Sequence, residues 1–238
     1  MTIDGDQAPP PPLQRDPQPR AKWEPPETHI GRRAFLGLMV AGFAALFLGK
    51  DLFSWIASKA KTSPGGSGFR INSVAKGLVF DDATYRLTVD GLFRKPMTLT
   101  FPQFTDLPQV ERTRDFYCVE GWGVPGVVWR GVTLRELMGV ADIDPLATHL
   151  VFHSGDGVQY TDSLTLEEAM RDDTLLAHTV NGEPLTPDMG QPLRLVLPGS
   201  YGYKYVKWVV RVEAVALGSD GYTGYWEQYG YSQDATIK

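Results

Sequence analysis

A single thiol among aromatic and charged residues is the group in this sequence whose type and setting could do chemistry. Cys118 is the only cysteine among 238 residues, so an intramolecular disulfide is excluded. A lone cysteine is either a small buried hydrophobic residue or a reactive thiolate, and composition alone favours the first. Residues 114–123 predict that Cys118 lies at the end of a strand, directly before a turn flanked by Gly121 and Gly123. This setting keeps the reactive thiolate open as a hypothesis.

A second segment, residues 199–208, combines glycines with two lysines that are three positions apart. Glycine lets the backbone approach a ligand closely. Lys204 and Lys207 could therefore hold a phosphate group as mobile point charges. The alternative is an exposed strand whose lysines are solvated, and the residues by themselves leave both interpretations open.

Other familiar constellations of catalytic residues are missing from the sequence. It has no Gly-x-Ser-x-Gly elbow and no phosphate-binding loop of the Walker type. Cys118 and His153 could pair as the nucleophile and base of a thiol hydrolase. However, no third residue that would orient the histidine stands at a recognisable place. The four histidines also lack the paired spacing of a zinc site: His29, His149, His153 and His178.

The composition of the whole chain restricts the class of partner. The formal net charge is −5 and the sequence pI is about 5.4. This acidic balance argues against nucleic acid, whose binding requires a basic face. Hydrophobic residues make up 42% of the chain, enough for the core of one medium-sized domain once the N-terminal region is set aside.

The N-terminal region has the features of an export address. Residues 1–30 are rich in proline and poor in apolar residues, which predicts disorder. Arg32 and Arg33 stand directly before an apolar run, which looks like the twin-arginine signal of bacterial export; an ordinary signal anchor is the alternative. We expect a signal or membrane anchor at residues 31–58 and a flexible linker at 59–68. The globular domain would then be held at the cell membrane, on its periplasmic or extracellular side.

The elements expected downstream form a strand-rich α+β domain at residues 69–217, followed by a tail rich in tyrosine and glycine at 218–238. The Thr-x-x-Glu patterns at Thr133 and Thr165 predict capping boxes that begin two short peripheral helices. Asn-Gly at residues 181–182 is typical of a hairpin turn. Alternating or apolar runs predict strands at residues 85–89, 97–101, 149–152, 175–180, 183–185, 194–197 and 205–217.

Five segments, in their order along the chain, carry a resemblance to a known family. They are Cys-Val-Glu-Gly-Trp at 118–122, Trp-Arg-Gly-Val-Thr-Leu at 129–134, Asn-Gly-Glu-Pro-Leu at 181–185, Gly-Gln-Pro-Leu-Arg-Leu at 190–195 and Tyr-Gly-Tyr-Lys-Tyr-Val-Lys-Trp at 201–208. Any one could arise by chance, whereas five in the right order are specific. The globular part of the chain resembles the molybdopterin-binding domain of the sulfite oxidase superfamily. Within it, the chain is similar to the bacterial branch that includes periplasmic methionine-sulfoxide reductase catalytic subunits.

The resemblance implies a Mo-molybdopterin cofactor and gives roles to individual residues. Cys118 would be the sulfur ligand of the protein to molybdenum, since a soft thiolate suits a metal already held by dithiolene sulfurs. Arg194 and Lys207 would hold the phosphate of the pterin. Lys204, the other member of the lysine pair, would belong to the same cofactor-binding set.

Further positions match the family pattern less directly. The backbone amides of Tyr205 and Val206 would assist in holding the phosphate, and Ser154 would place a small hydroxyl group near the cofactor. Arg114, just ahead of the ligand cysteine, would face an oxygen bound at the metal or an anionic substrate. One position departs from the pattern, because relatives often have a polar residue where this chain has Met189, and a thioether cannot donate a hydrogen bond.

The resemblance implies oxygen-atom transfer on a small sulfur-type oxo substrate, by sulfite oxidation or sulfoxide reduction. The sequence carries no haem or iron–sulfur motif, so we expect a separate electron-transfer partner, for which a membrane cytochrome is the natural candidate. Two alternatives stay open. The departure at Met189 is compatible with a membrane-tethered binding module that has lost turnover, and Cys118 with His153 could still form a thiol hydrolase.

Overall fold

The computed structural model describes most of the chain beyond the linker. The predicted tail at 1–30, the signal or anchor at 31–58 and nearly all of the linker at 59–68 lie outside the described residues. Within the described part, no helix is long and apolar enough to cross a membrane. The membrane anchor therefore stays a prediction. The described residues are 68–74, 78–218 and 221–237.

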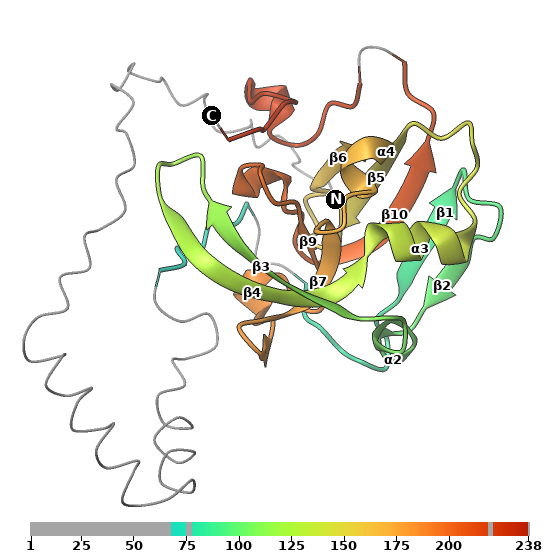
Figure 1. Ribbon diagram of the computed structural model, residues 1–238, viewed down its shortest axis with the longest axis horizontal. Coiled ribbons are helices and arrows are strands. Elements are labelled where there is room, and N and C mark those ends of the chain that lie inside the picture. Colours follow the sequence, from blue (N-terminus) through green and yellow to red (C-terminus); the bar gives the residue numbers. More distant parts are fainter. Residues whose placement is uncertain (1–67, 75–77, 219–220, 238) are drawn as a thin grey trace, which may run out of the picture.

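The first of two sheets brings together strands from both ends of the domain (Figure 1). Its order is β2-β1-β10-β5-β6. β1 and β10 run parallel, and the other neighbours are antiparallel, including the predicted pair of β1 and β2 at the start of the domain. The strand bounds are Leu87–Gly91 for β1, Met97–Leu99 for β2, His149–Ser154 for β5, Thr161–Thr165 for β6 and Val209–Val215 for β10.

The second sheet has the order β3-β4-β7-β8, and β9 also pairs with β7. β3 and β4 form the long antiparallel hairpin of Figure 1, and Cys118 follows directly after β3, as predicted. Asn181 and Gly182 have φ values of 52° and 81° in the tight turn between β7 and β8, which confirms the predicted hairpin. The bounds are Val110–Tyr117 for β3, Gly123–Thr133 for β4, Leu175–Val180 for β7, Glu183–Pro184 for β8 and Arg194–Val196 for β9.

Within the described residues, three short α-helices lie beside the sheets: α2 (Phe101–Thr105), α3 (Leu134–Ala141) and α4 (Leu166–Ala169). Both predicted helix starts are confirmed. Thr165 and Glu168 form the complete capping box of α4, and the Thr133 side chain accepts a hydrogen bond from the Glu136 amide at 3.2 Å at the start of α3. These bonds satisfy amides of the first turn that no helical carbonyl can reach.

Two predicted strands are wrong at one end. The strand predicted at 97–101 ends at Leu99, because Thr100 caps α2 and a proline occupies the first turn, where its missing N–H is not needed. The strand predicted at 205–217 begins only at Val209, the start of β10. Before it lie the 3-10 helix η2 (Gly202–Lys204) and a turn in which Trp208 has a φ of 51°. A left-handed residue interrupts extended backbone, so the strand cannot begin earlier.

One hydrophobic core joins the two sheets. The first sheet contributes Val89, Phe152 and Val212, and the second contributes Trp129 and Leu195, all of them buried. Replacing a core side chain as large as Trp129 by alanine typically costs about 3–5 kcal/mol of unfolding free energy. The predicted strand-rich α+β domain with short helices is confirmed.

The tyrosine-rich C-terminal segment, residues 221–237, packs back against the domain (Figure 1). It contains the 3-10 helix η3 (Glu227–Tyr229) and ends in an isolated bridge between Ser200 and Thr236. The remaining 3-10 helix, η1 (Pro187–Met189), lies between β8 and β9. The described domain thus includes the C-terminal segment as part of its packing.

Candidate active site

A pocket of about 420 Å³ brings together residues that are far apart in the sequence. Its volume lies within the ~300–1,000 Å³ that is usual for small-molecule sites. Residues of the N-terminal segment 69–74, the turn after β3, the region around β9 and η2, and the C-terminal segment all contribute to its wall. Five of the predicted site residues line it, and so does the residue that departs from the family pattern: Cys118, Ser154, Arg194, Tyr205, Lys207 and Met189.

The local backbone presents Cys118 to this pocket. β3 ends at Tyr117, and the Cys118 amide donates to the Trp122 carbonyl at 2.8 Å, while the Gly121 amide donates to the Cys118 carbonyl at 3.1 Å. Gly121 has a φ of 84°, which glycine adopts without the steric cost that a side chain would bring. The tight turn fixes the cysteine at the tip of a rigid hairpin. Its thiol is free of any disulfide and half-buried.

The surroundings of the Cys118 thiol favour its protonated form, and a metal ion bound there would displace the proton. Burial raises the pKa of the thiol, and the charge of Glu120 raises it further, while backbone donors and the charge of Arg194 lower it. Coordination to a metal ion deprotonates a thiol outright. Close by, the Asn72 side-chain amide donates to a Glu120 carboxylate oxygen at 2.9 Å. The sulfur therefore lies next to a hydrogen-bonded carboxylate.

Arg194 is a buried cation without an acidic partner. Its side chain belongs to a residue that is 4% exposed, and its Cζ lies 5.3–5.8 Å from the ring centroids of Phe116, Trp129 and Tyr205. One guanidinium nitrogen, Nη1, donates to the Met189 carbonyl at 3.1 Å, but Nε is buried with no hydrogen-bond partner. No carboxylate in the described part of the chain forms an ion pair with it. Burial lowers its pKa to about 10, so the cation is retained at neutral pH.

Lys207, which is close to Arg194, is likewise a cation whose bonds go to neutral groups. Its Nζ donates to the Asn72 carbonyl at 2.8 Å, the Ser73 hydroxyl oxygen at 2.7 Å and the Asp188 carbonyl at 3.0 Å. Among the described residues it has no ion pair with a carboxylate. Burial and the neighbouring charge of Arg194 lower the pKa of Lys207 to about 7. Two cations thus face one pocket without a protein counter-ion, which is the electrostatic setting of an anion site.

The wall holds a further polar group that no protein atom satisfies. The Ser154 hydroxyl oxygen is buried and has no hydrogen-bond partner within the described residues. The Met189 side chain is buried, yet the bond to Arg194 comes from the Met189 carbonyl and does not depend on the side chain. Buried polar groups are generally hydrogen-bonded to protein, water or a ligand, so the Ser154 hydroxyl is free to bond a polar ligand in the pocket.

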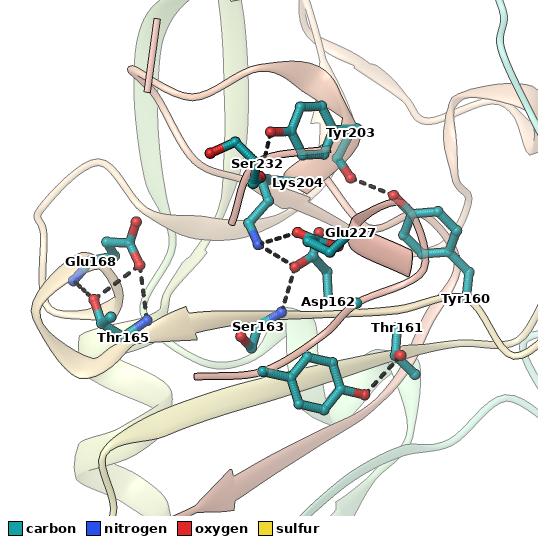
Figure 2. Close-up of polar contacts among 12 residues, drawn as sticks. Tyr160, Thr161, Asp162, Ser163, Thr165, Glu168, Tyr203, Lys204, Glu227 and Ser232 are labelled. Carbon is teal, nitrogen blue, oxygen red and sulfur yellow. Dashed lines mark hydrogen bonds and ion pairs between the residues drawn. The ribbon is translucent and has the colours of Figure 1, made fainter. Parts of the chain in front are cut away.

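Lys204 does not share the role predicted for it. Figure 2 shows its ammonium group between two carboxylates, of Asp162 and of Glu227, and the second of these lies 3.1 Å away. The charges of these partners raise the pKa of Lys204 although burial opposes them. The side chain therefore points into the protein, away from the pocket, and its charge is already neutralised. The expectation that Lys204 contacts the cofactor is corrected, because the turn after η2 separates the directions of the two lysines.

Arg114 also lies outside the pocket lining. Its Nε is 2.9 Å from an Asp173 carboxylate oxygen, and its Nη1 donates to the Thr113 carbonyl. This guanidinium is paired with a carboxylate and is not part of the pocket lining, so the structure gives no support to its predicted role at the metal or the substrate. The backbone amides of Tyr205 and Val206 are occupied too, because they donate to the Gly202 and Lys204 carbonyls at 3.2 and 3.0 Å. The structure thus shows both amides bonded within the protein, so their help in holding a phosphate stays a prediction, while Tyr205 itself lines the pocket.

The cysteine–histidine pair of a thiol hydrolase is not assembled. His153 Nε2 is 3.0 Å from a Glu213 carboxylate oxygen, and Arg211 lies at 3.4 Å from the same nitrogen. These contacts lie within the first sheet, and His153 is not part of the pocket wall that contains Cys118. A nucleophile and its base must be within hydrogen-bond reach. This arrangement does not supply that geometry.

The structure adds pocket residues that the sequence did not reveal. Asn72 reaches the site from the N-terminal segment, and Glu120 stands two positions after the cysteine. Trp226 and Tyr231 reach it from the C-terminal segment. The high aromatic content of that segment was the one available signal, and nothing in the local sequence marks Asn72.

Comparison with known proteins agrees with this geometry. The family model described as oxidoreductase molybdopterin binding domain matches residues 74–223. The chain belongs to this family. Its predicted place in the sulfite oxidase superfamily is thereby confirmed, and with it the Mo-molybdopterin cofactor and the class of molybdenum-dependent oxidoreductase.

Individual relatives indicate which members of this family the chain is similar to. The chain is 35% identical over 153 residues to an uncharacterized oxidoreductase, YuiH, of Bacillus subtilis, covering 64% of this chain and 75% of the relative. It is 38% identical over 149 residues to the protein-methionine-sulfoxide reductase catalytic subunit MsrP of Gluconobacter oxydans, covering 56% of this chain but only 47% of that protein. The crystal structure of the sulfane dehydrogenase SoxCD from Paracoccus pantotrophus matches with a TM-score of 0.56 at 28% identity, over 61% of this chain and 41% of that chain.

The residues of the pocket fit the cofactor of this family. A pterin dithiolene carries a phosphate, for which the buried Arg194 and the half-buried Lys207 provide two cations that form no ion pair with a carboxylate of the described residues. The unsatisfied Ser154 hydroxyl and Arg194 Nε offer hydrogen bonds to the same group. Cys118 supplies the soft sulfur that molybdenum accepts. These four contacts stay predictions about individual residues, and the unpartnered atoms are their structural support.

Proposed function

We propose that this protein reduces a small neutral organic sulfoxide by molybdenum-dependent oxygen-atom transfer. The observation that carries the proposal is the charge around Cys118. The Asn72 side-chain amide lies 2.9 Å from a Glu120 carboxylate oxygen and 4.0 Å from the Cys118 sulfur, and Arg114, the cation expected to face the substrate, is bound to Asp173 outside the pocket lining. An inorganic oxyanion such as sulfite would meet this carboxylate without a dedicated counter-charge.

The cofactor accounts for the two remaining cations of the pocket lining. Arg194 and Lys207 hold its phosphate, and the charge of a bound phosphate cancels theirs. When bound, the molybdenum supplies two-electron oxygen-atom transfer. The residues of the chain keep the sulfur of Cys118 in place, orient the cofactor and exclude water. A neutral sulfoxide crosses such a pocket at a lower desolvation cost than an anion.

The name of the methionine-sulfoxide reductase catalytic subunit of Gluconobacter oxydans supports this direction of the reaction. The overall equation is R₂SO + 2H⁺ + 2e⁻ → R₂S + H₂O, so one sulfoxide consumes two electrons from an external donor. We infer that a separate redox partner, a membrane cytochrome, delivers them. The paired arginines at 32–33 and the apolar run behind them support export of the folded domain and its retention at the outer face of the membrane.

The test uses the full chain, expressed together with cofactor synthesis and purified with its molybdenum. Molybdenum and pterin are quantified first, and turnover is then measured with reduced methyl viologen and either dimethyl sulfoxide or methyl phenyl sulfoxide. Sulfite oxidation is measured separately with ferricyanide as the electron acceptor. We expect sulfoxide reduction to exceed sulfite oxidation in kcat/KM by at least about 100-fold, which corresponds to ~2.7 kcal/mol.

Two variants make the test specific. Cys118→Ala removes the proposed metal ligand and is expected to abolish turnover, whereas Arg114→Gln removes a cation outside the pocket and is expected to leave kcat/KM within about two-fold, since exposed ion pairs are worth ~0–1 kcal/mol. A loaded enzyme that oxidises sulfite and ignores both sulfoxides would reverse the proposed direction. Loss of turnover in Arg114→Gln would show that the charge argument is wrong.

A further inference from the structure

The C-terminal segment, residues 221–237, is built into the pocket rather than appended to the domain. The Tyr225 amide donates to the Thr161 carbonyl at 2.9 Å, and the Tyr201 amide donates to the Ala235 carbonyl at 2.9 Å. These bonds hold the segment against β6 and against the loop after β9. The residues beyond 223 lie outside the matched family domain, so this part of the wall is not specified by that domain.

Two aromatic side chains of this segment face the same pocket as Cys118. Trp226 and Tyr231 line it, with their ring centroids 5.0 Å apart, and the Tyr231 ring lies 5.2 Å from that of Tyr203, which also lines the pocket. Tyr160 completes the group, and its hydroxyl donates to the Tyr203 carbonyl (Figure 2). We call these four pocket residues the aromatic wall: the Tyr231 ring contacts those of Trp226 and Tyr203, and Tyr160 is joined to Tyr203 by its hydrogen bond.

A buried ion pair fixes this wall in place. Glu227, the residue after Trp226, lies 3.1 Å from Lys204 Nζ, and the two side chains are only 3% and 5% exposed. Lys204 is the residue after Tyr203, so one pair holds both halves of the wall, and Asp162 contacts the same ammonium group. Removing one member of a buried pair leaves an uncompensated charge, which makes the arrangement resistant to displacement.

The chemistry of the wall indicates what part of a substrate it contacts. Aromatic faces bind apolar substituents and make favourable contacts with sulfur, while they offer nothing to a hydrated oxyanion. We propose that Trp226 and Tyr231 are specificity-determining residues that bind the organic substituent of the sulfoxide. The Lys204–Glu227 pair acts through them as a positioning pair. The inference rests on the proposed function, because it names the part of the substrate that the same site selects.

The experiment compares two neutral sulfoxides that differ in one substituent, methyl phenyl sulfoxide and dimethyl sulfoxide. The molybdenum-loaded enzyme, Trp226→Ala and Tyr231→Ala are assayed with reduced methyl viologen, and molybdenum content is measured for each. Tyr229→Ala is a stringent control, since Tyr229 is 37% exposed and does not line the pocket, while its ring lies 6.0 Å from that of Trp226, so it tests for the loss of packing behind the wall. Each variant is also titrated with methyl phenyl sulfide, the product, in a calorimeter.

We expect Trp226→Ala to lower kcat/KM for methyl phenyl sulfoxide about ten-fold more than for dimethyl sulfoxide, mainly through KM, which corresponds to ~1.4 kcal/mol. Tyr231→Ala should act in the same direction. Binding of methyl phenyl sulfide should weaken by a similar factor, whereas Tyr229→Ala should keep the wild-type ratio. An unchanged ratio in Trp226→Ala with full molybdenum content would overturn the inference.

The positioning pair is tested by Glu227→Gln, which keeps the size of the side chain and removes its charge. We expect KM for methyl phenyl sulfoxide to rise while kcat for dimethyl sulfoxide changes much less, a split that general destabilisation would not produce. Equal losses for both substrates would show that the pair is only structural. If the wild-type enzyme reduces neither sulfoxide, the proposed function fails by itself. The calorimetric comparison then decides whether the aromatic wall binds the organic substituent. Weaker binding of methyl phenyl sulfide to Trp226→Ala supports this role, and equal binding refutes it.

Discussion

Lys204 and Lys207 lie only three residues apart in this chain, and the different surroundings of the two lysines separate a structural role from ligand binding. Around Lys204, two carboxylates from β6 and from the C-terminal segment neutralise the ammonium group within the protein. Around Lys207 and Arg194, the partners are carbonyls, a hydroxyl group and aromatic rings, with no ion pair to a carboxylate in the described ranges. The charge of Lys204 is compensated within the protein, whereas no carboxylate of the described residues pairs with Lys207 or Arg194.

The difference shows why a lysine cannot be assigned a role from its type alone. Burying a charge is costly unless a counter-charge compensates it, so each buried cation must find an anion either in the protein or in a ligand. Lys204 forms ion pairs with Asp162 and Glu227 and helps to hold the pocket wall. Burial and the neighbouring charge of Arg194 lower the pKa of Lys207 to about 7, and this environment supports its predicted role at the cofactor phosphate, which stays a prediction.

The largest effect expected from this comparison is on stability at Lys204. Lys204→Met leaves the two carboxylates buried without their cation, and breaking such a buried pair typically costs about 3–5 kcal/mol of unfolding free energy. Urea unfolding of the cofactor-free protein measures it. Lys95→Met is the control, because Lys95 forms an exposed pair with Asp142 and is 71% exposed in its side chain. Comparable stability of the two variants would mean that the ion cluster contributes little.

The reverse result is expected at Arg194. Arg194→Met removes a buried charge that has no protein counter-ion, so the cofactor-free protein should be as stable as the wild type or more stable. Cofactor retention should fall, with molybdenum and pterin per protein reduced by about ten-fold or more, equivalent to ~1.4 kcal/mol of binding. Elemental analysis and pterin fluorescence measure this loss. Full retention would show that the phosphate is held elsewhere.

The smallest effect concerns the pH dependence set by Lys207. In the folded, cofactor-free protein its pKa is lowered to about 7, so above that value the folded state binds fewer protons than the unfolded chain. The stability of the cofactor-free protein should therefore rise with pH between about 7 and the ordinary pKa of lysine near 10.4. A bound phosphate raises this pKa again, so binding takes up a proton and cofactor affinity falls as pH rises through the same window.

This dependence is measured as the difference in melting temperature between loaded and cofactor-free protein from about pH 6 to pH 9, a range that covers the change in protonation. The difference should be largest at the acidic end and shrink as pH rises. Lys207→Gln should flatten the profile. Lys204→Gln should leave its slope unchanged, because Asp162 and Glu227 compensate the charge of Lys204. A flat wild-type profile would remove Lys207 from the phosphate site.

Local sequence patterns predicted local structure well. The two threonine caps, the Asn-Gly hairpin and the turn after Cys118 all depend on residues within four positions of one another, and each is present. The strand predicted at 205–217 failed at its start, because a left-handed Trp208 and η2 replace extended backbone there. Alternating hydrophobicity does not reveal such a turn when every residue in it is also partly buried.

The sequence by itself determined the family, the ligand cysteine as a candidate, and Arg194 and Lys207 as a pair of cations for one anion. Only the tertiary structure decided which cations remain uncompensated. Lys204 meets a carboxylate 42 positions before it and another 23 positions after it, and Arg114 meets one 59 positions away. Charge compensation acts through space over such separations, and no local pattern encodes it. The aromatic wall likewise brings together residues that are distant in the sequence, so only the folded structure reveals it.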